Sequence, residues 1–434
     1  MARPMTLTEK ILAAHAGKAD VSPGDIISIS LDLVMANELS AAVAITEFRK
    51  IQGATKVWDA SKIALVPSHF TPNKDIATAT LSSLMRSFAK EQQIENYFEV
   101  GRGGIEHVVL PENGMIGPGM TIIGGDSHTT TYGGLGAFAT GVGSTDIAAA
   151  FATGEMWVRV PPSIKIVYEG TLRPYTSAKD IILQTIGRIG VDGAIYAALE
   201  FTGPTVKELP ISGRFTMANM SIEAGAKNGI FAVDASAEAY CAAVGKKDYT
   251  VYHADKNAEY QDVIAIDCSG IEPQVAIPWL PENTKNASDL NHLTVAQAVI
   301  GTCTNGRIED MRQAAEVLKG RKIHPDVRAI VIPGSQKVYM QCIKEGLAEI
   351  FVEAGCVLST PTCGPCVGGH MGVLSEGERC ISTTNRNFRG RMGHVKSEVY
   401  LAGPYVAAAS AIAGFITGPE QLGAAAPVRA EVTA

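Results

Sequence analysis

Three cysteines have the residue type and spacing best suited to chemistry in this chain. Cys363 and Cys366 lie in a Cys-Gly-Pro-Cys segment, and Cys303 lies upstream in Gly-Thr-Cys-Thr-Asn-Gly. Zinc normally takes four ligands, whereas an iron–sulfur cube on three thiolates keeps one iron without a protein ligand, and that iron is a Lewis acid. The spacing alone leaves a metal site and unrelated free cysteines equally open.

The Cys-Gly-Pro-Cys segment is also typical of a thioredoxin-type dithiol. That chemistry needs a helix beginning at the first cysteine, because the helix dipole lowers the thiol pKa. The residues that follow, 367–372, include three glycines and are a poor helix start. Two thiolates on a loop suit a metal better. The five remaining cysteines are expected to be small core residues: Cys241, Cys268, Cys342, Cys356 and Cys380.

Other common functional motifs are either absent from the sequence or lack the structural context that they require. No P-loop, His-Glu-x-x-His or Gly-x-Ser-x-Gly segment occurs. Gly134-x-Gly136-x-x-Ala139 formally fits the dinucleotide fingerprint, but it does not directly follow a strand, so we expect a loop and packing role. The net charge of −7 and the lack of a basic run make nucleic acid and anionic lipid poor partners.

Composition indicates an ordinary globular chain of several domains. It has 434 residues, 46% of them hydrophobic, which at roughly 100–200 residues per domain predicts two to four units. The first residues do not resemble a secretory signal, and the eight scattered cysteines indicate a reducing compartment, so we expect a cytoplasmic protein. The apolar stretch 401–418 is broken by Pro404 and glycines, and we expect a core helix and no membrane span.

Short β-branched runs alternate with helical patterns, which predicts an α/β fold with largely parallel sheets. A capping box at Thr6 and Glu9 predicts a first short helix that Gly17 can end. Breaks at 160–163 and 277–291 divide the chain into predicted domains 1–161, 162–286 and 287–434. The predicted strands are 63–66, 121–123, 164–167, 263–266, 327–332 and 356–359, and two predicted helices are 76–92 and 311–319.

Four segments in this order resemble the aconitase superfamily. They are Gly125-Asp-Ser-His-Thr-Thr130, Cys303-Thr-Asn305, Cys363-Gly-Pro-Cys-Val-Gly-Gly369 and Thr384-Asn-Arg-Asn-Phe-Arg-Gly-Arg391. The resemblance covers residues 5 to 420. It implies three α/β/α domains of aconitase type around one [4Fe–4S] cluster on Cys303, Cys363 and Cys366. It also implies the dehydration and rehydration of a hydroxy-dicarboxylate.

The resemblance implies five residues for proton transfer. Removing water from a hydroxy acid needs an electrophile at the leaving oxygen, an acid that protonates it, and a base for the carbon proton. Candidate acids are His69, His107 and His128. Asp126 and Glu223 match family carboxylates that hydrogen-bond such histidines, and a neighbouring carboxylate raises a histidine pKa.

The resemblance also implies five substrate-binding residues. Arg386 and Arg391 are expected to grip carboxylates, because a guanidinium offers two parallel hydrogen bonds. Asn385 is expected nearest the cluster, and Ser127 in contact with the substrate. Asn219 is expected beside the cluster, on the same helix face as Glu223 four residues later.

The chain departs from the family pattern twice. Ser68 stands where many relatives place Asp before the active-site histidine, and a serine cannot hold His69 as an imidazolium by charge. No Gly-Ser-x-Arg segment occurs, so the swivelling fourth domain with its serine base is expected on a separate small subunit. The sequence leaves open which dicarboxylate is the substrate. Two other classes of protein also stay open: an inactive iron–sulfur regulatory protein and a dithiol oxidoreductase.

Overall fold

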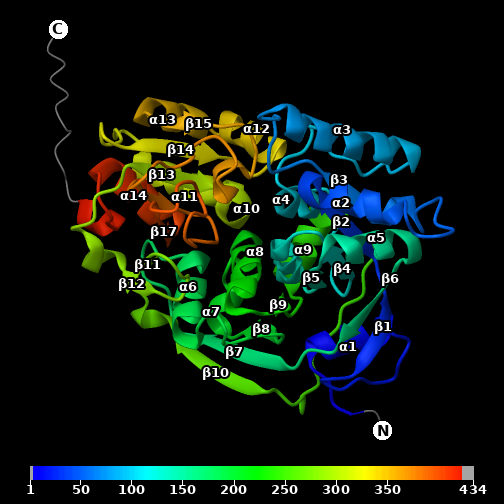
Figure 1. Ribbon diagram of the computed structural model, residues 1–434. Coiled ribbons are helices and arrows are strands. Elements are labelled where there is room, and N and C mark those ends of the chain that lie inside the picture. The colour runs from blue at the N-terminus through cyan, green and yellow to red at the C-terminus, as the bar shows by residue number, and fades with distance from the viewer. Residues whose placement is uncertain (1–2, 423–434) are drawn as a thin grey trace, which may run out of the picture. The chain divides into compact units, whose positions relative to one another are not determined.

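The computed structural model describes residues 3–422 of the chain (Figure 1). The alanine-rich tail at 423–434, which ends the predicted third domain, lies outside the described residues. The chain forms two compact units. Unit 1 comprises Met1–Thr171 and Ile189–Ser269, and unit 2 comprises Leu172–Arg188 and Gly270–Ala434. The division into three domains stays a prediction.

Unit 1 contains two parallel sheets and one antiparallel pair. Its sheets run β3-β2-β4-β5 and β10-β7-β8-β9, each parallel throughout, and β1 pairs antiparallel with β6. Its elements are α1 (Leu7–His15), β1 (Ile26–Ser30), β2 (Leu33–Asn37), α2 (Glu38–Phe48), β3 (Ile63–Val66), α3 (Ile76–Glu91), α4 (Glu106–Glu112), β4 (Thr121–Gly124), β5 (Phe138–Gly141), α5 (Ser144–Thr153), β6 (Glu155–Arg159), β7 (Ser163–Glu169), β8 (Ala198–Thr202), α7 (Pro204–Lys207), α8 (Ile211–Met220), β9 (Asn228–Phe231), α9 (Ala235–Ala243) and β10 (Asp262–Asp267), with 3₁₀ turns η1 (Ala60–Lys62), η2 (Ser127–Leu135) and η3 (Ser221–Ala224).

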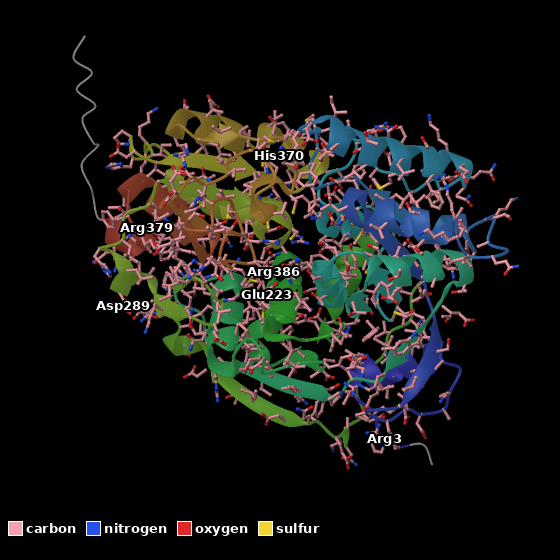
Figure 2. All side chains as sticks on the ribbon, viewed as in Figure 1. Arg3, Glu223, Asp289, His370, Arg379 and Arg386 are labelled. Carbon is pink, nitrogen blue, oxygen red and sulfur yellow. The ribbon has the colours of Figure 1, made fainter. Side chains whose placement is uncertain are left out.

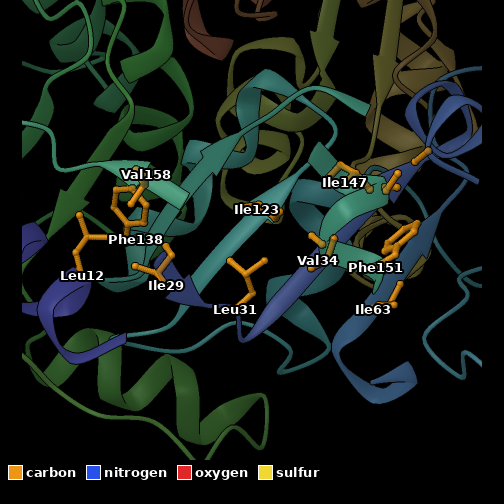
Figure 3. Close-up of a cluster of buried hydrophobic side chains, with 14 of the residues drawn as sticks. Leu12, Ile29, Leu31, Val34, Ile63, Ile123, Phe138, Ile147, Phe151 and Val158 are labelled. Carbon is orange, nitrogen blue, oxygen red and sulfur yellow. The ribbon is translucent and has the colours of Figure 1, made fainter. Parts of the chain in front are cut away.

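A continuous hydrophobic core holds the first sheet of unit 1 to its helices. Figure 3 shows this core, in which Leu12 of α1, Val34 of β2 and Phe151 of α5 are buried. Phe88 of α3 stacks on Phe151, with ring centroids 5.8 Å apart. Burial of this apolar surface fixes the strands whose ends carry the histidine site.

Unit 2 contains one mixed sheet in the order β12-β11-β17-β16-β13-β14-β15. Strands β17, β16, β13, β14 and β15 pair in parallel, whereas β11 pairs antiparallel with β12 and β17. Its elements are α6 (Ala178–Ile189), β11 (Gln274–Ala276), β12 (Thr284–Asn286), β13 (Gln297–Gly301), α10 (Thr302–Asn305), α11 (Ile308–Leu318), β14 (Arg328–Ile332), α12 (Gln336–Lys344), α13 (Leu347–Ala354), β15 (Val357–Leu358), β16 (Arg379–Ser382), β17 (Glu398–Ala402) and α14 (Pro404–Ala413), with 3₁₀ turns η4 (Cys268–Gly270, which crosses the boundary between the units), η5 (Ala287–Leu290), η6 (Gly364–Val367) and η7 (Pro419–Leu422).

The alternation of strands and helices predicted from the sequence is confirmed. The predicted strands coincide with β3, β4, β7, β10, β14 and β15 to within two residues at each end, and the predicted helices are α3 and α11. The Thr6–Glu9 capping box opens α1, where the Thr6 amide donates to Glu9 Oε2 at 2.8 Å. The stretch 401–418 contains the buried helix α14, and no helix within residues 3–422 is both long and apolar enough to cross a bilayer.

Candidate functional site

Three neighbouring strands of unit 1 lead to two of the residues predicted to move protons and to one carboxylate that was not predicted. β2 pairs in parallel with both β3 and β4. Their carboxyl ends lead to Glu38, to His69 and to Asp126 respectively. Because the carboxyl ends of parallel strands meet at one edge of the sheet, this topology brings side chains distant in the sequence into one cluster.

Asp126 connects two of the predicted histidines. His107 Nε2 lies 2.8 Å from Asp126 Oδ1, and the His128 backbone amide donates to the same oxygen at 2.8 Å. A carboxylate only accepts hydrogen bonds, so Nε2 of His107 carries the proton, while its Nδ1 lies 3.1 Å from the Tyr132 hydroxyl. Burial alone would raise the pKa of Asp126, but hydrogen bonds from His107 and His128 outweigh it and hold that pKa well below its ordinary value.

Glu223, the second predicted carboxylate, pairs with His128. His128 Nε2 lies 2.9 Å from Glu223 Oε1, and Figure 2 labels Glu223. Asn219 Nδ2 donates to Thr131 Oγ1 at 2.8 Å. The expectation that one helix carries both Asn219 and Glu223 is wrong, because α8 ends at Met220 and Glu223 lies in the following 3₁₀ turn η3.

His69 lies among carboxylates, contrary to what Ser68 suggests. Ser68 Oγ is 2.9 Å from His69 Nδ1. Two carboxylate oxygens also face the ring, since Glu106 Oε1 is 3.9 Å from Nδ1 and Asp126 Oδ2 is 3.9 Å from Nε2. The buried carboxylate of Glu38 accepts the backbone amides of residues 68, 69 and 70 at 2.7–2.8 Å and fixes this loop. The surroundings of His69 therefore carry negative charge.

Ser127 begins η2 directly after Asp126. Both residues line a pocket within unit 1, together with Asp146, Tyr196 and Lys227. The structure therefore places Ser127 beside the cluster of histidines and carboxylates and at the wall of a pocket, a position that suits contact with a small ligand.

In unit 2, Cys303 follows the end of β13 on a tightly constrained turn. Gly301 has φ +131°, and a Cβ there would lie 2.0 Å from the carbonyl oxygen of Ile332. Thr302 is buried with φ +70°, a backbone conformation that costs free energy in a non-glycine residue and is concentrated at functional sites. Arg307 Nη1 donates to the Cys303 carbonyl at 3.1 Å and closes the turn.

Cys363 directly precedes the 3₁₀ turn η6 and Cys366 lies within it, and both cysteines are buried. The Cys366 amide donates to the Cys363 carbonyl at 2.9 Å, and the turn η6 ends at Gly368 with φ +63°. A Cβ at Gly368 would contact the Arg391 carbonyl oxygen at 3.0 Å, so this turn packs against the segment with the predicted arginines. No long helix begins at Cys363, which removes the main support for a thioredoxin-type dithiol.

Asn385 contacts two of the three cysteine sulfurs. Its Nδ2 donates to Cys303 Sγ at 3.3 Å, and its Oδ1 lies 3.8 Å from Cys366 Sγ. It follows β16, the strand that pairs in parallel with β13, so the carboxyl edge of this sheet brings Asn385 to Cys303. The expectation that Asn385 lies nearest a cysteine-bound group stays a prediction, and its contacts with two of the sulfurs support it.

The two predicted arginines lie on the loop after β16. Both are partly exposed, and Arg386, labelled in Figure 2, has its guanidinium 5.9 Å from the Phe388 ring centroid. Asn387 between them is buried and anchors the loop, because its Nδ2 donates to the Ile277 carbonyl at 2.9 Å. The loop is therefore anchored in the core at Asn387, while the side chains of Arg386 and Arg391 on either side of it are partly exposed.

The surroundings of Cys303, Cys363 and Cys366 suit an iron–sulfur cluster. The donor set is three soft sulfur atoms, all buried, with an Asn385 N–H donated to one of them. Close by, the fully buried Lys179 donates to the carbonyls of residues 383 and 384 at 2.8 and 2.6 Å. Burial lowers the pKa of Lys179 to about 7, and the charge of Cys303 opposes that shift. The protonated form of Lys179 would offset part of the negative charge of a cluster held beside Cys303 and Cys366.

Three functional candidates were missed by sequence reasoning: Glu38, Glu106 and Lys179. Glu38 follows a strand directly and Glu106 directly precedes His107, and these positions were the only local signals for them. Lys179 reaches the cysteine loops from α6, more than a hundred residues away in the sequence, and no local pattern indicates it.

The fold and these residues define an α/β protein with three buried cysteines in unit 2 and carboxylate-bound histidines in unit 1. The model of the aconitase family (aconitate hydratase) matches residues 9–290 and 280–414. The chain belongs to the aconitase family, as the resemblance in its motifs predicted.

Close relatives cover nearly the whole chain. The 3-isopropylmalate dehydratase large subunit of Moorella thermoacetica is 58% identical over 418 residues, 96% of this chain and 99% of that protein. The proteins of the same name from Thermodesulfovibrio yellowstonii and Caldicellulosiruptor saccharolyticus are 58% and 57% identical over 419 and 424 residues, 96% and 98% of this chain and 99% of each relative. Among solved structures, holo-form aconitase X of Thermococcus kodakaraensis matches with a TM-score of 0.48 and 11% identity, covering 87% of this chain and 88% of that one.

Proposed function

We propose that this chain is the large subunit of a 3-isopropylmalate dehydratase, a hydro-lyase of leucine biosynthesis that interconverts 2-isopropylmalate and 3-isopropylmalate. The observation that carries the proposal is 58% identity to relatives of that name over 96% of the chain. The proposal includes three α/β/α domains at 1–161, 162–286 and 287–434, and a small subunit that carries the swivelling domain.

Cys303, Cys363 and Cys366 would hold the [4Fe–4S] cluster. When bound, the cluster supplies a Lewis acid for the hydroxyl and one carboxylate of the substrate. Arg386 and Arg391 bind substrate carboxylate, where each guanidinium offers paired N–H donors. Asn385 orients the cysteine sulfurs through its amide.

His69 is the proposed proton donor to the departing hydroxyl. Its Nδ1 is bound by Ser68, so the proton leaves from Nε2, the nitrogen that faces Asp126 across 3.9 Å. Asp126 orients His107, and Glu223 orients His128. The base that takes the carbon proton is proposed to lie on the small subunit, since the family's serine-bearing segment does not occur in this sequence.

The test is turnover by the anaerobically purified chain mixed with its small subunit, followed by the absorbance of the unsaturated dicarboxylate. We expect turnover of 2-isopropylmalate, and little with 2,3-dimethylmalate or homocitrate. His69→Ala should cost a factor of roughly 10²–10⁴ in rate, the usual contribution of a positioned acid, whereas the exposed His253→Ala should not change it. Preference for another dicarboxylate would reassign the substrate, and no turnover of any would favour an inactive regulatory protein.

A further inference from the structure

Glu106 is a buried carboxylate that the proposed chemistry does not yet use. It is the first residue of α4 and is 1% exposed. Its Oε1 accepts a hydrogen bond from Asn37 Nδ2 at 3.2 Å, and its Oε2 is buried without a hydrogen-bond partner among the described residues. A buried carboxylate oxygen left unsatisfied costs free energy, so packing and stability alone do not explain this residue.

The position of Glu106 relates it to two histidines. Oε1 lies 3.9 Å from His69 Nδ1 and 3.9 Å from His107 Nε2. His107 already donates from that nitrogen to Asp126 at 2.8 Å. Asp126 thus accepts hydrogen bonds from His107 and the His128 amide, whereas within residues 3–422 Glu106 forms its ion pairs with His69 and His107.

The groups around His69 come from four segments. Its own loop supplies the uncharged Ser68 hydroxyl, and α2 supplies Glu38, whose carboxylate accepts the backbone amides of the loop. The segment after β4 supplies Asp126, and α4 supplies Glu106 next to His107. At about 4 Å, an opposite charge in a buried site shifts a pKa by roughly 1–3 units toward the charged form.

We propose that Glu106 is a positioning residue for the dehydration: its carboxylate supplies, from α4, the negative charge beside His69 that Ser68 lacks. The charge keeps His69 in the imidazolium form from which Nε2 gives its proton. This inference rests on the proposed function, because it assigns Glu106 to the acid of that reaction.

The test is the pH profile of kcat/KM for the cluster-loaded chain with its small subunit. Glu106→Gln removes the charge and keeps the shape, and it should move the alkaline limb down by about one pH unit. Ser68→Asp combined with Glu106→Gln should move the limb back, because the charge returns from the neighbouring position. Glu112→Gln, at the other end of α4, is the matched control and should leave the limb in place.

A purely structural role predicts a different pattern: Glu106→Gln would lower stability without moving the limb, and Ser68→Asp would not rescue it. That result overturns the inference. Should Glu106→Gln fail to fold, Glu106→Asp keeps the charge and must retain the limb, and loss of the limb there also overturns it.

A second readout does not depend on turnover. In ¹³C-histidine NMR spectra, assigned by the signal lost in His69→Ala, Glu106→Gln should lower the His69 pKa by about one unit. An unchanged pKa refutes the inference even if the wild-type complex is active. An inactive complex with a shifted pKa would refute the proposed function alone.

Discussion

The cysteines divide into two groups by their surroundings. Burial raises the pKa of Cys268 to about 11 and that of Cys342, Cys356 and Cys380 to about 12, so these thiols stay protonated at neutral pH and are poor metal ligands. Cys303 and Cys366 instead lie against the Asn385 amide and affect the buried Lys179. The expectation from the sequence that the scattered cysteines are core residues agrees with this division.

Iron content tests this division directly. Cys303→Ser should remove most of the iron and sulfide from the anaerobically purified chain, about four irons being expected per wild-type chain. Cys356→Ser, at another buried thiol, should retain them. A full iron complement in Cys303→Ser, or zinc in the wild type, would contradict the assignment of the three ligands.

At the residue scale, the sequence predicted functional residues that lie in recognisable motifs. It did not predict contacts that only the fold creates. The family resemblance implied that Asp126 and Glu223 bind histidines, and in the structure they lie within hydrogen-bond distance of His107 and His128 respectively. The charge around His69 could not be predicted, because Glu38 and Glu106 reach it from separate helices. Only the parallel order of β2, β3 and β4 brings those segments together.

Among the elements, the turn after β13 is the most constrained part of the cysteine site. Gly301→Ala would place a Cβ 2.0 Å from the Ile332 carbonyl oxygen, at φ +131°. We expect a loss of at least roughly 3 kcal/mol in the free energy of unfolding, together with a loss of bound iron. Gly320→Ala is the control: φ is +72° there, but the space is open, so the cost should be about 1–2 kcal/mol with iron retained. Urea unfolding and iron assays measure both, and equal effects of the two substitutions would count against the constraint.

The buried Asp310 in α11 should make the free energy of unfolding of the cluster-free chain depend on pH. Burial raises the pKa of Asp310 to about 6, partly opposed by hydrogen bonds from the Asn305 side chain and the Arg307 amide. Between the unfolded pKa of 3.8 and about 6, the folded state binds the additional proton, so the free energy of unfolding falls as pH rises through that interval. The fall from this group is about 3 kcal/mol.

Asp310→Asn removes this titration. Relative to the wild type, its free energy of unfolding should therefore increase by about 3 kcal/mol from pH 4 to pH 7, as measured by urea unfolding at each pH. A difference between the two proteins that stays constant over this range would show that Asp310 does not titrate as its burial requires.

Element boundaries followed from local signals wherever a cap or a breaker residue marks them. The capping box of α1 and the strand β3 were predicted to the residue. The end of α8 was not, because Ser221 has no breaker beside it. Its hydroxyl donates to the Ala218 carbonyl at 2.7 Å and competes with the helix hydrogen bonds, and the 3₁₀ turn then ends at Gly225 with φ +84°.

For the whole chain, the residues for the two halves of the proposed chemistry lie in different units. Unit 1 contributes the histidines and their carboxylates, and unit 2 contributes the three cysteines and the arginines. The sequence predicted strands, helices and most of these residues. It did not predict that β11 and β12 join the unit-2 sheet, which therefore begins at Gln274. The reason is that β11 pairs with β17, more than a hundred residues later, and such a distant partner leaves no local pattern in the sequence.

The proposed division of labour between cluster, chain and partner is tested most directly by turnover against iron content. Preparations of the chain with graded cluster occupancy are mixed with excess small subunit and assayed with 2-isopropylmalate. The rate should rise in proportion to bound iron, on a line through the origin. Cys356→Ser should fall on the same line and Cys303→Ser near the origin. The chain without its small subunit should be inactive. Turnover by iron-free chain, or full turnover without the small subunit, would contradict it.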